Sequence, residues 1–257
     1  MNEEKESGRG IAAFFDLDGT LVAGPSLERR FFRMLRYRGA IPMKNYFLWL
    51  REAVRLSPQG VRAMGYANKM YLRGITPGTV NRQASGISFL AAAVDRMAWH
   101  AKQEHKIVLV SGTLEMLARE AAKQLEAELG ARGPAAKIHV CATRLEEREE
   151  KWTGQVIGPA MYGEAKAEAV RWMAEEEGLD LTKCYAFGDS MMDYWMLAAV
   201  GRPVAVNPSK ELLRFARRRN WPTQLWEKRL KEESTQSTQR AQRRSGEQEV
   251  AGSEMGA

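Results

Sequence analysis

Four short apolar runs, each ending in acidic or small residues, constrain the fold of this chain more than any other feature. Such runs are typical of strands buried on both faces, and helical patterns separate them along the chain. This alternation predicts an α/β fold with a mostly parallel sheet, in which ligands bind beyond the carboxyl ends of the strands. The runs are IAAFF at 11–15, IVLV at 107–110, CYAF at 184–187 and PVAV at 203–206.

The segment between the first two runs has a different pattern. Residues 24–86 carry apolar residues at helical spacing with arginines between them, which predicts a small helical cap inserted after the first strand. The core domain is then expected to comprise residues 11–23 and 87–226. Within it, residues 137–157 have the pattern of two strands joined by a charged turn, so a β-hairpin is expected there.

The most specific chemical signal is the segment DLDGT at 16–20, directly after the first run. Asp16 and Asp18 crowd two carboxylates at a strand end, where they repel each other and Mg²⁺ is the natural compensating charge. With the ion bound, Asp16 can stay ionised and attack phosphorus. Asp18 is close enough to protonate the leaving oxygen and then activate water. A solvated acidic turn is the alternative interpretation of the same residues.

Three further segments follow the other strands in an order that suits the same chemistry. Ser111 and Gly112 end the second strand, where a hydroxyl and backbone N–H groups can hold phosphate oxygens at a helix N-terminus. Lys166 is a lone lysine on a predicted helix, a position that is normally exposed. Asp189 and Asp193 follow the third run; Asp189 would complete a metal site, and Asp193 could accept a hydrogen bond from Lys166 or hold a metal-bound water.

Together, the four segments resemble the haloacid dehalogenase (HAD) superfamily, and their spacing is similar to its phosphoserine-phosphatase-like branch, subfamily IB. The resemblance covers roughly residues 11–222 and includes TRL at 143–145 and WTG at 152–154. It implies a Rossmann-like core with a C1-type helical cap after the first strand. It also implies a Mg²⁺-dependent phosphomonoester hydrolase that forms an aspartyl-phosphate on a small phosphorylated metabolite.

The resemblance also implies a role for each site residue. Asp16 is the nucleophile and a metal ligand, and Asp18 is the acid and base whose backbone carbonyl binds Mg²⁺. Asp189 is the third metal ligand, and Asp193 is a supporting acid. The residues expected to bind the phosphoryl group are Thr20, Ser111, Gly112 and Lys166.

Two departures from the branch bear on the substrate. Phosphoserine phosphatases have a glutamate nine residues after the nucleophile that reads the substrate amine, and this chain has Pro25 there. They also have an asparagine before the last acid, where this chain has Met192. We therefore expect a substrate other than phosphoserine. A HAD-type phosphotransferase, or a protein that binds nucleic acid or an anionic surface on a HAD scaffold, remains an alternative.

Two basic regions flank an acidic remainder. Residues 24–86 carry twelve Lys and Arg against two acids, and residues 212–244 carry ten against three. Such regions can attract phosphorylated substrates, nucleic acid or anionic lipid, although a solvated helical face explains them equally well. Because the sequence has no nucleic-acid-binding motif, the expected partner is a small, multiply anionic phosphorylated substrate rather than nucleic acid.

The remaining features concern the compartment. Cys141 and Cys184 lie far apart without metal-ligand spacing, so we expect buried, reduced thiols. No apolar run approaches the roughly 20 residues that a membrane span needs, and the polar start does not resemble a signal peptide. These features favour a cytoplasmic protein. Residues 1–10 and 227–257 are poor in apolar residues and are expected to be disordered.

Overall fold

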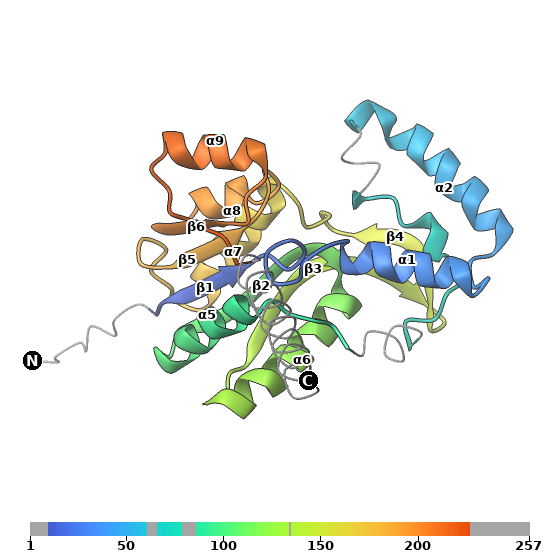
Figure 1. Cartoon of the computed structure of the whole chain (residues 1–257). Coiled ribbons are helices and arrows are strands. Elements are labelled where there is room, and N and C mark those ends of the chain that lie inside the picture. Colours follow the sequence, from blue (N-terminus) through green and yellow to red (C-terminus); the bar gives the residue numbers. More distant parts are fainter. Residues whose placement is uncertain (1–9, 61–65, 79–85, 134, 227–257) are drawn as a thin grey trace, which may run out of the picture.

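The residues that the structure describes are built around one seven-stranded sheet (Figure 1). The strands are β1 Ala12–Phe15, β2 Lys106–Leu114, β3 Ile138–Arg148, β4 Lys151–Ile157, β5 Tyr185–Gly188, β6 Arg202–Val206 and β7 Thr223–Gln224. This computed structural model describes residues 10–60, 66–78, 86–133 and 135–226. The strand order is β4-β3-β2-β1-β5-β6-β7, and only the β3–β4 pair is antiparallel. The predicted α/β fold with a mostly parallel sheet is confirmed.

The central strand β1 is buried on both faces. Ala13 and Phe15 belong to the apolar cluster on one side of the sheet, and Phe15 stacks on Phe187 of β5 with ring centroids 4.5 Å apart. Ala12 and Phe14 belong to the cluster on the other side, since successive strand residues point to opposite faces. A strand without a polar face explains why the sequence shows a continuous apolar run rather than an alternating one.

Helices cover both faces of the sheet and contribute to its two apolar clusters (Figure 1). They are α5 Ala91–Lys102, α6 Glu115–Arg132, α7 Glu164–Glu176, α8 Tyr194–Ala198 and α9 Lys210–Arg218. Most buried apolar side chains of α5 and α6 belong to one cluster, and most of those of α7, α8 and α9 belong to the other. The β-strands and helices therefore alternate along the chain as the apolar pattern predicts.

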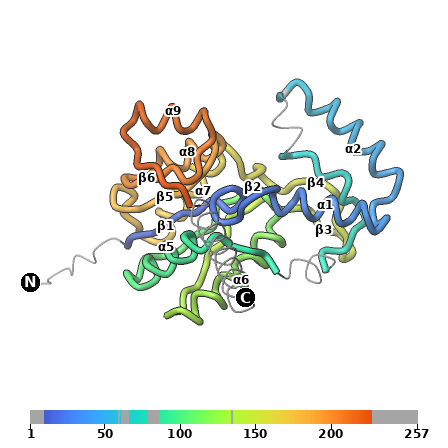
Figure 2. The backbone as a smooth tube through the Cα atoms, viewed as in Figure 1, coloured from blue at the N-terminus to red at the C-terminus, as the bar shows by residue number. Residues whose placement is uncertain are grey.

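A group of helices follows β1, as the sequence predicts. The elements are α1 Leu27–Tyr37, α2 Met43–Leu56 and the short 3₁₀ turns η1 Ser57–Gln59 and η2 Met70–Leu72. The Ser26 hydroxyl caps α1 by accepting a hydrogen bond from the Arg29 backbone N–H at 3.2 Å. Leu35 of this helix is fully buried. Helix α2 lies farther from the sheet, at the edge of the molecule (Figure 2). That residues 24–86 form a separate cap domain stays a prediction.

The ends of the described chain differ slightly from expectation. Gly10 was expected in a disordered tail, but its N–H donates to the Gly178 carbonyl at 3.0 Å and it bridges Leu179. The other residues of both expected tails lie outside the described ranges. Both cysteines are free thiols; Cys184 is buried as expected, whereas Cys141 is half-buried. Across the described ranges, every helix is too short or too polar to cross a membrane.

Candidate active site

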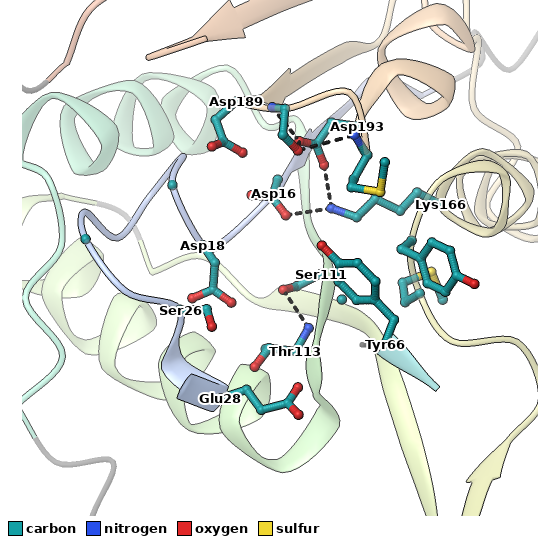
Figure 3. A pocket seen from close by; sticks show the side chains of 17 residues that line it. Asp16, Asp18, Ser26, Glu28, Tyr66, Ser111, Thr113, Lys166, Asp189 and Asp193 are labelled. Carbon is teal, nitrogen blue, oxygen red and sulfur yellow. Dashed lines mark hydrogen bonds and ion pairs between the residues drawn. The ribbon is translucent and has the colours of Figure 1, made fainter. Parts of the chain in front are cut away.

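A cavity of about 320 Å³ lies beyond the carboxyl ends of β1, β2 and β5 (Figure 3). This is the edge where open parallel sheets bind ligands. The residues lining it come from segments far apart in the sequence, from Asp16 to Asp193. The described lining consists of Asp16, Asp18, Gly19, Gly24, Ser26, Glu28, Tyr66, Ser111, Gly112, Thr113, Met161, Tyr162, Lys166, Asp189, Ser190, Met192 and Asp193.

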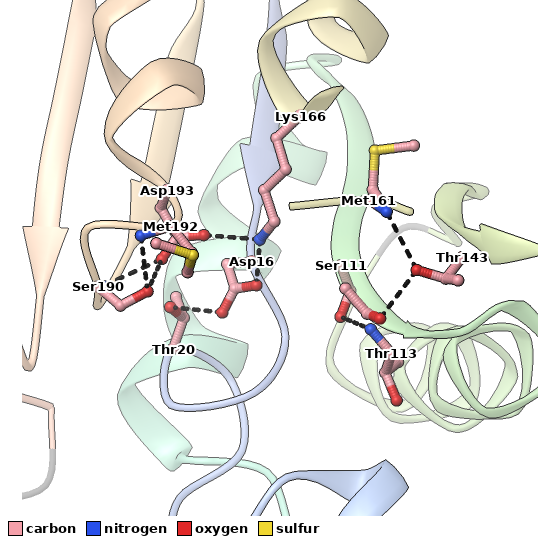
Figure 4. Close-up of polar contacts among 11 residues, drawn as sticks. Asp16, Thr20, Ser111, Thr113, Thr143, Met161, Lys166, Ser190, Met192 and Asp193 are labelled. Atoms are coloured by element: carbon pink, nitrogen blue, oxygen red, sulfur yellow. Dashed lines mark hydrogen bonds and ion pairs between the residues drawn. The ribbon is translucent and has the colours of Figure 1, made fainter. Parts of the chain in front are cut away.

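Asp16 is fixed at the end of β1 by its backbone and by both oxygens of its side chain. Its N–H donates to the Phe187 carbonyl of β5 at 2.9 Å. Lys166 Nζ lies 2.6 Å from Asp16 Oδ1, and the Thr20 hydroxyl donates to Oδ2 at 3.2 Å (Figure 4). Thr20 is fully buried and is absent from the described lining, so its visible contact positions Asp16. Direct binding of phosphate by Thr20 stays a prediction.

The turn after Asp16 requires glycine at position 19. Gly19 has φ +95°, a left-handed conformation that disfavours other residues. A Cβ atom here would lie 2.3 Å from Asp189 Oδ2, so the Asp189 carboxylate packs directly against this glycine. The DLDGT segment and the end of β5 therefore meet across the site, although they are far apart in the sequence.

Lys166 joins two of the carboxylates. Its Nζ lies 2.6 Å from both Asp16 Oδ1 and Asp193 Oδ1, and the lysine is buried on α7 (Figure 4). Burial alone would lower the pKa of Lys166, but the charges of Asp16 and Asp193 outweigh it and raise that pKa. The ammonium group therefore stays charged. A lone helix lysine, which is normally exposed, is here an internal cation of the site.

Three carboxylates crowd around this one cation. Asp16, Asp189 and Asp193 each offer an oxygen, and these atoms all lie within 4.8 Å of one another. Burial, followed by repulsion from Asp193, raises the pKa of Asp16 well above its usual value and that of Asp189 to about 7. A divalent cation at these oxygens would stabilise their ionised forms, so the donor set suits a metal such as Mg²⁺.

The two acids that follow β5 differ in their contacts. Asp193 is buried and has both oxygens engaged: Oδ1 with Lys166, and Oδ2 with the Ser190 N–H at 3.0 Å and the Ser190 hydroxyl at 2.9 Å. Asp189 is half-buried and faces Gly19 in the cavity. This arrangement suits the expected division, in which Asp189 holds a metal and Asp193 supports Lys166. These roles stay predictions.

Asp18 points away from the three carboxylates and towards the helix that follows (Figure 3). Its Oδ1 accepts from the Leu27 N–H, the first of α1, at 2.8 Å. Burial raises the pKa of Asp18 to about 6, which suits a group that gives and takes a proton near neutral pH. Because its side chain is committed elsewhere, the backbone carbonyl of Asp18 is the group expected to reach a metal.

The phosphate-binding segment is built differently from expectation. We expected a helix to begin at Ser111-Gly112-Thr113, but β2 runs on to Leu114 with a register shift, and α6 begins only at Glu115. Of the strand residues beyond the run at 107–110, only Leu114 is apolar, so the apolar pattern does not reveal this extension. The Gly112 carbonyl accepts a hydrogen bond from the Thr143 hydroxyl at 2.9 Å, and this contact holds the irregular end of β2 against β3. The buried Thr113 hydroxyl has no partner within the described protein and lines the cavity, so it can serve a ligand.

Glu28, an acid of α1 that lines the cavity, was not among the predicted site residues. Its Oε1 accepts from Lys69 Nζ at 2.6 Å and from the Tyr71 hydroxyl at 2.7 Å. Lys69 and Tyr71 are both buried, so this carboxylate is held rigidly at the rim. A signal existed: Glu28 is one of only two acids in residues 24–86 and lies three residues after Pro25.

Comparison with known proteins identifies the family to which this chain is similar. The family model described as haloacid dehalogenase-like hydrolase matches residues 13–198. A Mycobacterium tuberculosis protein named as a probable phosphatase is 33% identical over 223 residues, which cover 82% of this chain and 74% of that protein. A phosphoserine phosphatase of the same organism is 30% identical over 82% of this chain and 69% of its own length.

Solved structures agree on the fold. A Bordetella pertussis protein of unknown function superposes with a TM-score of 0.65 at 25% identity, covering 84% of this chain and 98% of that chain. A phosphoserine phosphatase in its apo form superposes with a TM-score of 0.58 at 19% identity, covering 87% and 97%, and supports the fold alone. On its sequence motifs, its family match and its relatives, the chain belongs to the haloacid dehalogenase-like hydrolases, as a phosphatase of the phosphoserine-phosphatase-like kind.

Proposed function

We propose that this chain is a Mg²⁺-dependent phosphomonoester hydrolase that forms an aspartyl-phosphate on Asp16. The observation that carries the proposal is the setting of Asp16. This carboxylate is buried at a strand end, oriented by Lys166 and Thr20, and faces a cavity of about 320 Å³. A fixed carboxylate beside a buried cation is suited to nucleophilic attack on an anionic phosphoryl group.

The residues of the site supply each step of this reaction. An Asp16 oxygen attacks phosphorus and the bond to the leaving oxygen breaks, while Asp18 donates the proton that the leaving oxygen needs. Asp18 then takes a proton from water, which attacks the phosphorus of the aspartyl-phosphate, so that inorganic phosphate leaves and Asp16 is restored. Lys166, Ser111 and Thr113 line the cavity, and we expect the ammonium group and the two hydroxyls to bind phosphoryl oxygens throughout.

Mg²⁺ would be held by Asp16, Asp189 and the backbone carbonyl of Asp18. When bound, it offsets the charge of the carboxylates and of the phosphoryl oxygens.

Removing divalent metal is expected to lower p-nitrophenyl phosphate hydrolysis by about 100-fold or more, because the charge stabilisation of a catalytic metal is worth several kcal/mol. The measurement compares turnover in EDTA with turnover after Mg²⁺ is restored. Full activity in EDTA would rule out the metal part of the proposal. Equal release of phosphate and nitrophenol indicates hydrolysis, whereas a shortfall of phosphate when an alcohol is added indicates transfer to that acceptor.

The charges of the residues that line the cavity indicate which class of leaving group the site can accept. Lys166 is its single cation, against five acids: Asp16, Asp18, Glu28, Asp189 and Asp193. The basic regions suggested a multiply anionic substrate. The described lining offers no second cation that could bind the extra negative charge of such a substrate. At the rim, Lys69 lies 2.6 Å from Glu28 and offsets its charge. We therefore favour a neutral, hydroxyl-bearing leaving group that donates to Glu28, over an ammonium such as that of phosphoserine.

Glycerol phosphate is accordingly expected to have a kcat/KM about tenfold or more above L-phosphoserine and above a sugar bisphosphate. In the Glu28→Gln variant this advantage should shrink, because a hydrogen bond to a charged acceptor is worth about 1.5–3 kcal/mol, or roughly tenfold or more in rate. The matched control is Glu52→Gln, at an acid of α2 that does not belong to the described lining. Equal losses for glycerol phosphate and p-nitrophenyl phosphate in Glu28→Gln would give Glu28 a structural role only.

A further inference from the structure

Helix α2 presents a stripe of apolar side chains to solvent. Met43, Phe47, Leu50 and Val54 are 72%, 71%, 63% and 67% exposed. Their spacing of four, three and four residues puts them within about 60° of one another around the helix axis. Single exposed apolar residues are ordinary, but a contiguous exposed apolar face marks an interaction surface. None of the four belongs to the described lining of the cavity, so the surface is independent of the hydrolytic site.

The opposite face of α2 is anchored, so the stripe is not needed to hold the helix in place. The Asn45 amide is buried and donates to the carbonyls of Tyr71 at 3.2 Å and Arg73 at 2.7 Å. Trp49 packs towards Phe32 of α1, with ring centroids 6.4 Å apart. Figure 2 places α2 at the outer end of the molecule, away from the sheet. The apolar stripe therefore faces outward from a fixed support.

Basic side chains line one flank of the stripe. Lys44, Arg51 and Arg55 are exposed and lie about 40–140° around the helix from the stripe residues. Glu52, the only acid of α2, is paired with Arg55 at 2.5 Å and does not offset the other two. Residues 36–38, at the end of the preceding helix, add Arg36 and Arg38, both exposed.

We propose that the apolar stripe of α2 docks on an anionic lipid surface, with Lys44 and Arg51 against the headgroups. A helix that is aromatic and aliphatic on one face and Lys/Arg-rich beside it is the usual form of an interfacial helix. The charge complementarity favours anionic lipid over a second copy of this chain. A two-fold contact joins the same patch of both subunits, and with the two helices antiparallel the basic flank of each would lie beside that of the other.

The test is co-sedimentation of the full chain with vesicles. Binding to vesicles that contain phosphatidylglycerol is expected to exceed binding to pure phosphatidylcholine by about tenfold, and added salt should weaken it. The Phe47→Ser, Leu50→Ser double variant should lose at least about tenfold of this binding, since the buried apolar area is lost. Hydrolysis of p-nitrophenyl phosphate should stay at the wild-type rate, because the substituted side chains are exposed and remote from the cavity.

Two controls separate this surface from other basic regions. Trp172→Ser removes a 56% exposed tryptophan of α7 and should leave vesicle binding unchanged. Lys44→Gln with Arg51→Gln should abolish the preference for phosphatidylglycerol. Undiminished vesicle binding by the Phe47→Ser, Leu50→Ser variant, or no binding by the wild type, overturns the proposal. A dimer in ultracentrifugation that this variant loses, without vesicle binding by the wild type, assigns the stripe to self-association instead.

Discussion

Replacing Asp16 by asparagine is expected to lower the turnover of p-nitrophenyl phosphate by on the order of 10⁴-fold or more, because the amide cannot attack phosphorus. The two side chains are nearly isosteric, so the amide oxygen can replace Asp16 Oδ1 as the acceptor from Lys166, and the amide NH2 group can donate to the Thr20 hydroxyl, which accepts as well as donates. The measurement is turnover under saturating Mg²⁺, with folding checked by circular dichroism. The control is Asp95→Asn, an acid of α5 outside the described lining of the cavity, which should leave turnover unchanged.

The same substitution is expected to leave the metal-free protein at least as stable as the wild type. Burial and the neighbouring Asp193 raise the pKa of Asp16, so its carboxylate is held in a setting that disfavours the charge. A neutral amide avoids that penalty. Mg²⁺ should raise the melting temperature of the wild type more than that of the variant, because the variant loses a ligand. If Asp16→Asn retains a tenth of wild-type turnover, Asp16 is not the nucleophile.

The parts of the fold that sequence predicts well are those governed by local pattern. β1 and β5 are buried on both sides, so their residues form continuous apolar runs. Parallel strands put their carboxyl ends at one edge, and this rule is enough to bring Asp16, Ser111 and Asp189 together. The sequence pattern did not reveal β7, because two residues, Thr223 and Gln224, pair with β6 without an apolar signature.

Features that depend on contacts between distant residues escaped prediction. The Glu28–Lys69 ion pair joins side chains 41 residues apart, and neither residue has a local pattern that points to the other. The burial of Lys166 has the same origin. Its contact with Asp193 was expected from the sequence, whereas its ion pair with Asp16 appears only in the fold. Family resemblance therefore placed Lys166 at the site, whereas the place of Glu28 at the cavity appeared only in the structure.

The net charge of a segment also failed to predict which of its residues face the cavity. The basic balance of residues 24–86 suggested that this segment would attract a phosphorylated substrate, yet Arg51 and Arg55 of α2 are exposed and lie outside the described lining. The total charge of a segment does not say which face carries it. In the described chain, acids face the cavity and basic residues of α2 face outward, so one segment can serve two different surfaces.

Replacing Asp18 by asparagine is expected to lower turnover by about 10²- to 10⁴-fold, the usual contribution of general acid and base catalysis. The amide oxygen of Asn can still accept from the Leu27 N–H, so the start of α1 should stay in place. The backbone carbonyl, the expected metal ligand, is also kept. The affinity for Mg²⁺ should therefore be close to that of the wild type. It can be measured through the shift in melting temperature that the ion causes.

Comparing Asp18→Ala with Asp18→Asn separates the role of Asp18 in proton transfer from its hydrogen bond to the Leu27 N–H. Both variants lack the carboxyl, so both should show the loss in turnover, but only alanine leaves the Leu27 N–H without its partner. An orphaned donor costs about 1–3 kcal/mol, and each kcal/mol lowers the melting temperature of a domain of this size by about 2–4 °C. We expect Asp18→Ala to melt several degrees below Asp18→Asn. A loss in turnover below tenfold in Asp18→Asn would mean that another group moves the proton. A severe loss confined to Asp18→Ala would mean that Asp18 acts by anchoring α1 rather than by proton transfer.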